Sequence, residues 1–400
     1  MKVLFITQTF PYPLDTGSRN LIYHWLEACC RVHDVHLLAV TDENVRDLRI
    51  PGLDGLSVHL CPIEVSRSIP NRALRQAASL AQRVPAPSYI LLSSEVRRRI
   101  DAMLEEYRYD LVVLAENVVA GFAPFLRSIA PVLLVKHSVH ATDAHDLRVR
   151  NGPFNPRWII EELVERRFES ETCHAATAVC CVTDQDAAQL VSRYGLSNRV
   201  EAIPVGVDLT QFPQRDQDPD TNKIGFFGNL TWGANVDAVQ WFCQEVLPKV
   251  WQTNPDAKFV VAGIGGDRLR WLSADGRILF LGRVANIPEA LKDVSVGVVP
   301  VKSGTGIRFK LLEMLGMGIP TVSTSLGTEG SSCVHGRDLL IADDAETFSM
   351  SVNSLLSDAS LRRNLASSGV RVASAFSWEA IYPKILTLFD LTVQQRTHTA

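Results

Sequence analysis

The chain has 400 residues, and this length suggests two domains because a typical domain holds about 100–200 residues. Hydrophobic residues make up 46% and charged residues 21%, which is ordinary for a globular protein with buried cores. The formal net charge of −4 argues against a nucleic-acid partner, because proteins that bind nucleic acids carry an excess of basic residues.

The cysteines and the N-terminus indicate a protein of the reducing cytoplasm. The eight cysteines form no C-x-x-C pair, and Cys29–Cys30 and Cys180–Cys181 are adjacent, which suits neither zinc chelation nor ordinary disulfides. Reduced thiols are the simpler interpretation. The opening segment "MKVLFITQTFPYP" has no small-residue cleavage site, and no apolar run approaches the roughly 18–20 residues of a membrane span. Neither a signal peptide nor a transmembrane helix is expected.

In the first half of the chain, short apolar runs alternate with longer segments of helical periodicity. This β-α-β-α rhythm predicts a parallel sheet with helices on both faces. The predicted strands are Lys2–Thr7, Asp34–Val40, Asp110–Ala115, Pro131–Lys136 and Ala178–Val182, and the clearest predicted helices are Asn20–Arg31 and Ser94–Tyr107.

The rhythm begins again after the polar segment Pro213–Asn222, which we interpret as a linker or as the first surface loop of a second domain. The second half therefore predicts another doubly wound sheet, followed by an amphipathic helix in "FSWEAIYPKILTLFD". Its predicted strands are Lys223–Phe227, Lys258–Ala262, Ile278–Leu281, Ser295–Val299 and Thr321–Ser323, and its predicted helices are Val236–Val250, Ile287–Leu291 and Ile307–Met317.

The segment "GTGIRFKLLEMLGMGIPTVST", from Gly304 to Thr324, places a glycine-rich loop between a predicted strand and a helix. Free N–H groups and the helix dipole make such a loop a natural anion site, and open α/β sheets bind ligands at the carboxyl ends of their strands. Arg308 and Lys310 would add positive charge beside a phosphate, and Glu313 would accept two hydrogen bonds from a ribose diol. A surface ion pair between Lys310 and Glu313 is the alternative.

This segment resembles the donor-site signature of retaining glycosyltransferases of the GT-B fold, family 4-like. Other segments resemble the same family in the expected order, namely "FPYPLDTGSRNLIYHWLEA", "VKHSVHATDA", "AIPVGVDLTQF", "GFFGNLTWGANVDAVQWFCQEVLPKV" and "FSWEAIYPKI". The resemblance implies an α/β protein with two Rossmann-like, doubly wound parallel-sheet domains that face each other across a cleft. Residues 1–205, joined by the C-terminal helix at about 377–395, would bind the acceptor, and residues 206–376 would bind the nucleotide sugar.

The resemblance also implies roles for single residues. Glu313 falls on the family's glutamate that holds the nucleotide ribose, His137 falls on its histidine near the transferred sugar, and Gly17 lies on its N-terminal glycine loop. The implied catalytic residues are His137, Arg308 and Lys310, and the implied donor-binding residues are Gly17, Gly228, Asn229, Gly304, Thr305, Gly306, Ile307 and Glu313.

The chain departs from the family at the positions that usually hold the diphosphate. Thr305 stands at the first glutamate of the signature, and Asn229 and Asn235 stand where the family often has an arginine and a lysine. The departures indicate a relocated basic clamp, an altered donor or a dead site. We favour a relocated clamp formed by Arg308 and Lys310, with Lys302 as a third candidate.

The resemblance implies transfer of a sugar, with retention of anomeric configuration, from a nucleoside-diphosphate sugar to a glycan or lipid-linked acceptor. Neither a metal nor a cofactor is expected. The predicted task is bacterial cell-surface polysaccharide synthesis, in the cytoplasm and at the inner face of the membrane. Two alternatives stay open: a nucleotide-sugar epimerase or phosphorylase of the same fold, and a non-catalytic partner subunit with a degenerate donor site.

A basic stretch favours the peripheral membrane contact. From Arg67 to Arg99 the chain has seven arginines and one acid, Glu95, and part of this stretch has the pattern of an amphipathic helix. It would face an anionic membrane or a lipid-pyrophosphate acceptor, although solvated helix faces explain the arginines almost as well.

Overall fold

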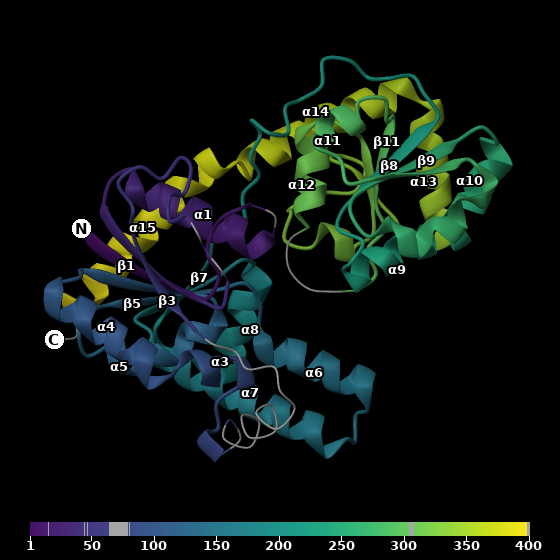
Figure 1. Cartoon of the computed structure of the whole chain (residues 1–400). Coiled ribbons are helices and arrows are strands. Elements are labelled where there is room, and N and C mark those ends of the chain that lie inside the picture. The colour runs from purple at the N-terminus through teal and green to yellow at the C-terminus, as the bar shows by residue number, and fades with distance from the viewer. Residues whose placement is uncertain are drawn as a thin grey trace. The chain divides into compact units, whose positions relative to one another are not determined.

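The structure is a computed structural model that describes residues 1–14, 16–43, 45, 47–63, 79, 81–303 and 308–397. The chain forms two compact units (Figure 1). The first contains Met1–Pro204 together with the chain from Tyr382 onward, and the second contains Val205–Ile381. Each unit is built on one parallel sheet, as the sequence predicts.

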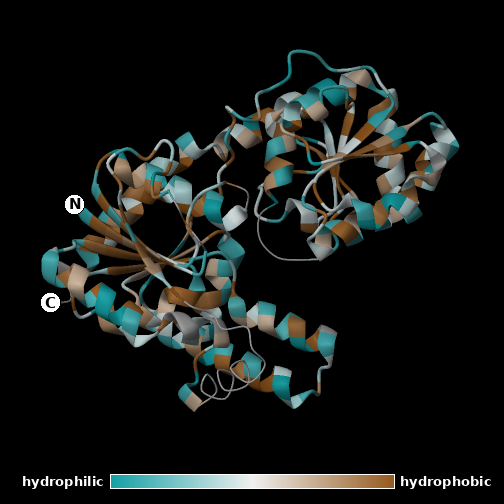
Figure 2. Ribbon diagram, viewed as in Figure 1, coloured by the Kyte–Doolittle hydropathy of each residue, from teal (hydrophilic) through white to brown (hydrophobic). Residues whose placement is uncertain are grey.

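Among its described residues, the first unit has a parallel sheet of seven strands in the order β3-β2-β1-β4-β5-β6-β7. All five predicted strands are confirmed to within one residue at either end. Because helices cover both faces, the central strands are buried along almost their whole length and appear as brown ribbons in Figure 2. The strands are β1 (Lys2–Thr7), β2 (Asp34–Thr41), β3 (Ser57–Pro62), β4 (Leu111–Ala115), β5 (Val132–Lys136), β6 (Ala178–Cys181) and β7 (Arg199–Ala202).

The helices around this sheet begin at polar capping residues in several cases. The side chains of Thr16, Ser93 and Thr183 each accept a hydrogen bond from the main-chain N–H three residues further on. In the described part of the chain, no helix is both long enough and apolar enough to cross a membrane. The helices are α1 (Gly17–Cys30), α3 (Ala86–Leu91), α4 (Ser94–Glu106), η1 (Asn117–Phe122), α5 (Ala123–Leu126), α6 (His140–Asn151), α7 (Pro156–Ala175) and α8 (Asp184–Tyr194).

The C-terminal helix α15 (Trp378–Thr397) belongs to the first unit from Tyr382 onward. The Tyr382 hydroxyl donates to the Glu27 carboxylate at 2.5 Å and lies 2.7 Å from Nδ1 of His24, both on α1. Hydrogen bonds from His24 and Tyr382 lower the pKa of Glu27 to about 2. This polar cluster, with the fully buried Phe389 further along, anchors the end of the chain to α1.

Among the described residues of the second unit, a parallel sheet has the strand order β10-β9-β8-β11-β12-β13. All five predicted strands of this half are confirmed, and three of them match residue for residue. The strands are β8 (Lys223–Phe227), β9 (Lys258–Ala262), β10 (Ile278–Gly282), β11 (Val296–Val299), β12 (Thr321–Ser323) and β13 (Leu340–Ile341).

One predicted helix of the second unit is wrong in detail. The sequence predicts a continuous helix over Val236–Val250, but a π-helical turn, η2 (Phe242–Val246), interrupts it. Pro248 explains the interruption, because proline lacks an N–H and its ring crowds the carbonyl of the preceding turn. The other helices are α9 (Gly233–Trp241), α10 (Leu247–Thr253), η3 (Gly266–Asp275), α11 (Ile287–Ala290), α12 (Phe309–Gly316), η4 (Leu326–Thr328), α13 (Ala345–Ser357) and α14 (Ala359–Ala375).

Three strands were not predicted from the sequence: β3, β7 and β13. Each lies at the edge of its sheet, and their residues are mostly half-buried. β3 (SVHLCP) and β7 (RVEA) mix polar with apolar residues, and β13 has two residues, so none of the three shows a continuous apolar run. The edge strand β10 (ILFLG) does show such a run, and it was predicted.

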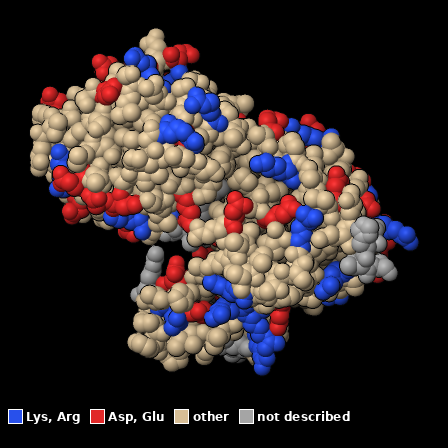
Figure 3. Space-filling model, turned by 180° about the vertical axis from the view of Figure 1, so that it is seen from behind, with Lys and Arg blue, Asp and Glu red and all other residues tan. Residues whose placement is uncertain are grey.

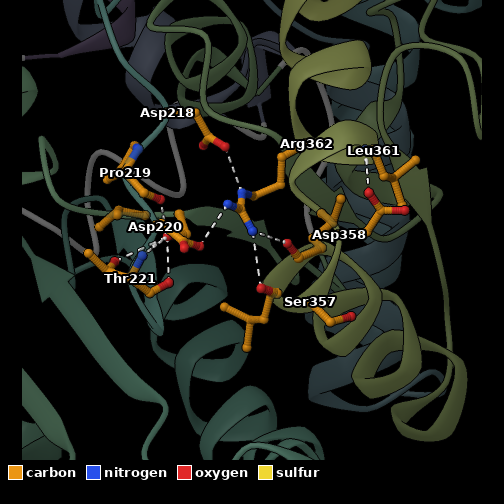
Figure 4. Close-up of polar contacts among 12 residues, drawn as sticks. Asp218, Pro219, Asp220, Thr221, Ser357, Asp358, Leu361 and Arg362 are labelled. Carbon is orange, nitrogen blue, oxygen red and sulfur yellow. Dashed lines mark hydrogen bonds and ion pairs between the residues drawn. The ribbon is translucent and has the colours of Figure 1, made fainter.

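The segment Pro213–Asn222, predicted as a linker or a surface loop, is fixed to the second unit by a buried arginine on α14 (Figure 4). Arg362 is 1% exposed, and it donates to Asp218 at 2.8 Å and to Asp220 at 3.1 Å. Its remaining guanidinium nitrogen donates to the main-chain carbonyls of Leu355 and Leu356 at the end of α13. The guanidinium thus joins the entry segment to two helices.

Replacing this arginine by an apolar residue is expected to destabilise the second unit. Arg362→Leu removes the side-chain donor of two buried carbonyl groups and leaves the Asp218 carboxylate with Arg215 as its remaining partner. We expect a loss of about 2–3 kcal/mol in the free energy of unfolding, measured by urea denaturation. The control is Arg371→Leu on the same helix, because Arg371 is exposed and contacts Ser367. Equal losses in the two variants would contradict this account.

Candidate functional site

Both sheets reverse their strand order next to their first strand. In the first unit the reversal lies between β1 and β4, and in the second it lies between β8 and β11. Ligands of open α/β sheets bind outside the carboxyl ends of the strands at such points. In the first unit Gly17 follows β1, and His137 follows β5, which is the neighbour of β4. In the second unit the described candidate residues follow β8 or β11, and they are Gly228, Asn229, Arg308, Lys310 and Glu313.

In the second unit, the structure brings the ammonium group of Lys310 to the end of β8. The group donates a hydrogen bond to Oδ1 of Asn235, and the Asn235 amide nitrogen donates to the carbonyl of Asn229 at 2.8 Å. Nζ of Lys310 also lies 4.7 Å from the centre of the Phe226 ring. Side chains from α12 and α9 are therefore joined over the loop that follows β8.

Lys310 is 8% exposed. Lys310 and Glu313 are both described by the structure, and they form no ion pair with each other. The alternative interpretation, a surface ion pair between these two side chains, is therefore wrong. Burial, together with the neighbouring charge of Arg308, lowers the pKa of Lys310 to about 7. An anion placed beside this ammonium group would favour its charged form.

Two glycines allow the strand ends to approach one another closely at this point. Gly228 has φ of +157°, and a Cβ atom there would stand 3.2 Å from Nζ of Lys310. Gly263, which follows β9, has φ of +145°, and a Cβ atom there would stand 1.9 Å from the carbonyl oxygen of Gly228. A side chain at either position would displace the loop. Asn229, the next residue, uses its side-chain oxygen to accept from the N–H of Thr231 at 2.8 Å.

Glu313 lies on α12, and Arg308 lies just before the first residue of this helix. Burial raises the pKa of Glu313 to about 7, and the charge of Lys310 opposes this rise. Arg308 is 5% exposed and is the N-terminal capping residue of the helix. Burial lowers the pKa of Arg308, and Glu329 opposes the shift. The predicted loop residues Gly304, Thr305, Gly306 and Ile307 lie outside the described residues.

In the first unit, His137 follows β5 and is joined to the start of α1. Its Nδ1 lies 3.1 Å from Oγ of Ser18, the residue after Gly17, which begins α1. Burial, with the charge of Lys136, lowers the pKa of His137 to about 4, so the ring is neutral near pH 7. Its Nε2 is buried and has no hydrogen-bond partner in the described part of the chain. The ring is thus held by one nitrogen, with the other left for a ligand.

A buried ion pair that the sequence analysis did not find fixes the segment around His137. Nζ of Lys136 lies 2.8 Å from the Glu169 carboxylate, and both side chains are inaccessible to solvent. Burial alone would lower the pKa of Lys136, but the Glu169 carboxylate raises it above its ordinary value. Glu169 also accepts from the main-chain N–H of His140 at 2.9 Å, and Lys136 donates to Asn117 at 2.7 Å. The feature of the sequence that could have indicated this ion pair is a lysine at the end of a buried strand.

Glu116, which directly follows β4, is a second residue that the sequence analysis missed. Its carboxylate accepts hydrogen bonds from the main-chain N–H groups of Gln8 and Thr9, both at 3.0 Å, and from the Thr9 hydroxyl at 2.9 Å. Burial raises the pKa of Glu116, against the effect of these bonds. Its φ is +87°, which non-glycine residues rarely adopt, and such strain gathers at functional sites. Glu116 ties the end of β1 to the end of β4 where the strand order reverses.

Among the residues that the structure describes, no group of three or more His, Cys, Asp and Glu side chains lies close enough to hold a metal ion.

The role of Glu116 can be separated into its hydrogen bonds and its charge. Glu116→Ala leaves the N–H groups of Gln8 and Thr9 unpaired, and we expect it to lower the free energy of unfolding by about 2–3 kcal/mol. Glu116→Gln keeps an acceptor oxygen, and we expect a loss under about 1 kcal/mol. Both values come from chemical denaturation, with the exposed Glu105→Ala on α4 as the control. An Ala variant as stable as the wild type would refute the role of these bonds.

Comparison with known proteins places the chain in a family. Residues 16–211 match the model described as Glycosyltransferase Family 4, and residues 221–358 match the model described as Glycosyl transferases group 1. A Klebsiella pneumoniae protein described as an uncharacterized 44.6 kDa protein in the cps region is 26% identical over 358 residues, covering 87% of this chain and 89% of that protein. D-inositol 3-phosphate glycosyltransferase 2 of Catenulispora acidiphila is 24% identical over 323 residues, covering 74% of each chain.

Among solved structures, HepE of Anabaena in complex with UDP has a TM-score of 0.69 at 14% identity, covering 98% of this chain and 100% of that one. HepE has also been solved with UDP-glucose. This likeness concerns the fold, and it agrees with the two parallel sheets described above. The chain belongs to the glycosyltransferases of family 4 and group 1, and its two α/β domains have the GT-B fold.

Proposed function

We propose that this glycosyltransferase moves a sugar from a nucleoside-diphosphate sugar to a glycan or lipid-linked acceptor, with retention of configuration and without a metal. The proposed task is bacterial cell-surface polysaccharide synthesis at the inner face of the membrane. The observation that carries the proposal is the buried ammonium group of Lys310, bonded to Asn235 beside the Gly228 backbone.

This arrangement suits the diphosphate of a nucleotide sugar. The leaving diphosphate gains negative charge as the glycosidic bond breaks, so a fixed cation at that place lowers the barrier. Lys310 is held by Asn235 and is largely removed from water, so its field is weakly screened. Gly228 has no side chain that would stand between the ammonium group of Lys310 and a phosphate.

The position of Lys310 also explains the departures from the family's usual sequence. The resemblance places Asn235 where relatives often carry a basic residue, and the ammonium group of Lys310 lies on the Asn235 side chain. The positive charge is thus supplied from α12 in place of α9. Arg308, two residues before Lys310, is the second member of the proposed clamp. This account favours a working donor site over a degenerate one in a non-catalytic subunit.

The remaining roles follow from chemistry and from the resemblance. The Glu313 carboxylate would accept hydrogen bonds from the ribose hydroxyls, and Nε2 of His137 would contact the transferred sugar. The UDP and UDP-glucose complexes of HepE support a nucleotide sugar as the donor, and the cps region of the Klebsiella relative supports a role in surface polysaccharide synthesis.

In the predicted membrane-contact segment Arg67–Arg99, residues 67–78 and 80 lie outside the described residues.

The first prediction concerns nucleotide binding. Calorimetry with UDP, GDP, ADP and dTDP, in the presence of a chelator, should find at least one ligand. Lys310→Met removes the charge while keeping the length of the side chain, and we expect roughly 10- to 100-fold weaker binding of that diphosphate, equivalent to about 1.4–2.8 kcal/mol. Binding of the corresponding nucleoside should change far less, because it lacks the phosphates.

The matched control is Lys223→Met, because Lys223 lies at the opposite end of β8 and pairs with Asp293. No binding of any nucleotide would reject the donor-site proposal. Once the base is known, incubation of the nucleotide sugar without acceptor tests the epimerase alternative. With an acceptor, NMR of the anomeric proton in the first product tests retention.

The second prediction concerns pH. Lys310 and Glu313 both have pKa values near 7, the first lowered and the second raised by burial. Above pH 7 Lys310 loses its proton and its attraction for the diphosphate, and below pH 7 Glu313 gains a proton and accepts fewer hydrogen bonds. Nucleotide affinity should therefore peak near pH 7 and fall on each side by up to about tenfold per pH unit. Lys310→Met should remove the alkaline decline, and Glu313→Gln should weaken the acidic one. An unchanged alkaline decline in Lys310→Met would contradict this assignment.

A further inference from the structure

The hairpin of α6 and α7 in the first unit carries an exposed apolar end. Phe154, in the connection between the two helices, is 90% exposed, and Leu163 on α7 is 59% exposed. Single exposed apolar side chains are common, but here several gather on one feature. The exposed apolar side chains of this end are Leu147, Val149, Phe154, Ile159, Ile160 and Leu163.

The connection that carries Phe154 has a defined structure. Arg148 donates to the carbonyl of Pro153 at 2.9 Å and to the Glu162 carboxylate at 2.6 Å, so one guanidinium joins α6, the connection and α7. The Asn155 side chain caps α7 by accepting from the N–H of Arg157. These bonds hold the turn in a conformation that leaves Phe154 in solvent. Exposure of this apolar side chain to water is unfavourable, and no contact within the described part of the unit offsets it.

The composition of this end is that of a membrane-interface segment. Residues 147–160 read "LRVRNGPFNPRWII", with three arginines, one tryptophan and no acid. Arginine stems cover apolar surface while their heads stay in water, and tryptophan favours the headgroup region. Arg148 and Arg157 pair with Glu162 and Glu161, which lie further along α7, so attraction to anionic lipid is secondary to apolar insertion.

We propose that the end of the α6–α7 hairpin, residues 147–160 with Leu163, inserts into the interface of a phospholipid bilayer. This surface is separate from the predicted segment Arg67–Arg99, and the proposal goes beyond the transfer of a sugar. In Figure 1 α6 reaches beyond the other helices of its unit, and Figure 3 shows the projecting lobe from behind as tan surface beside a group of Lys and Arg side chains. This narrow end suits insertion into a bilayer better than dimerisation, because a stable dimer needs a broad patch of roughly 800 Å² per partner.

The test is flotation of the full chain with vesicles. One set contains phosphatidylcholine alone, and another contains phosphatidylcholine and phosphatidylglycerol at a ratio of about 3:1, chosen so that the anionic fraction matches a moderately charged leaflet. We expect binding to both, with somewhat more to the second. Phe154→Ser combined with Val149→Ser should lower the partition coefficient at least tenfold, because it removes two apolar side chains from the inserted end.

The control is Val32→Ser combined with Met350→Ser, which removes two exposed apolar side chains elsewhere (58% and 60% exposed) and should leave flotation unchanged. Wild-type protein that floats with neither vesicle, or a hairpin variant that floats like the wild type, overturns the proposal. A dimer that the hairpin variant abolishes would assign the surface to a second copy and would also overturn it. Nucleotide binding is measured on every variant, so that failure here is distinct from failure of the proposed function.

Discussion

The reversal of strand order beside the first strand of each sheet is the constraint on which both candidate sites depend. Neighbouring connections leave the sheet toward opposite faces there, so the carboxyl ends of β8 and β11 are left open to ligands. At such a place the loops that follow neighbouring strands pass close to one another, so their main chains must come into contact. Gly228 and Gly263 allow this contact, because a Cβ atom at Gly263 would collide with the Gly228 carbonyl and one at Gly228 would crowd the side chains of Asn235 and Lys310.

A buried ammonium group is stable only where polar partners replace its water shell, and this explains why Lys310 and Asn235 occur together. Asn235 accepts from Lys310 and donates to the carbonyl of Asn229, so an amide is better suited to this position than a second cation would be. With Lys310 on α12, a lysine at position 235 would place two like charges side by side. In the proposed clamp, the positive charge would come from α12 in place of α9.

The sequence predicted the central strands of both sheets because they are buried on both faces and carry continuous apolar runs. It missed β3, β7 and β13, which are only partly buried and are either interrupted by polar residues or two residues long. It placed Lys310 near the candidate site from the helix register, but the bond to Asn235 joins residues 75 apart and follows only from packing. Glu116 and Glu169 were missed for the same reason, because their partners lie 107 or 108 and 33 residues away along the chain.

The two units have the same architecture but opposite charge where their strand order reverses. In the first unit the Glu116 carboxylate lies at this point, and a neutral His137 and a Lys136 balanced by Glu169 follow the neighbouring strand β5. In the second unit the groups are the ammonium of Lys310, Arg308, and Glu313, whose pKa burial raises to about 7. A diphosphate would be repelled by the first arrangement and attracted by the second. This difference, which does not depend on resemblance, supports assigning the nucleotide to the second unit and the uncharged hydroxyl of an acceptor to the first.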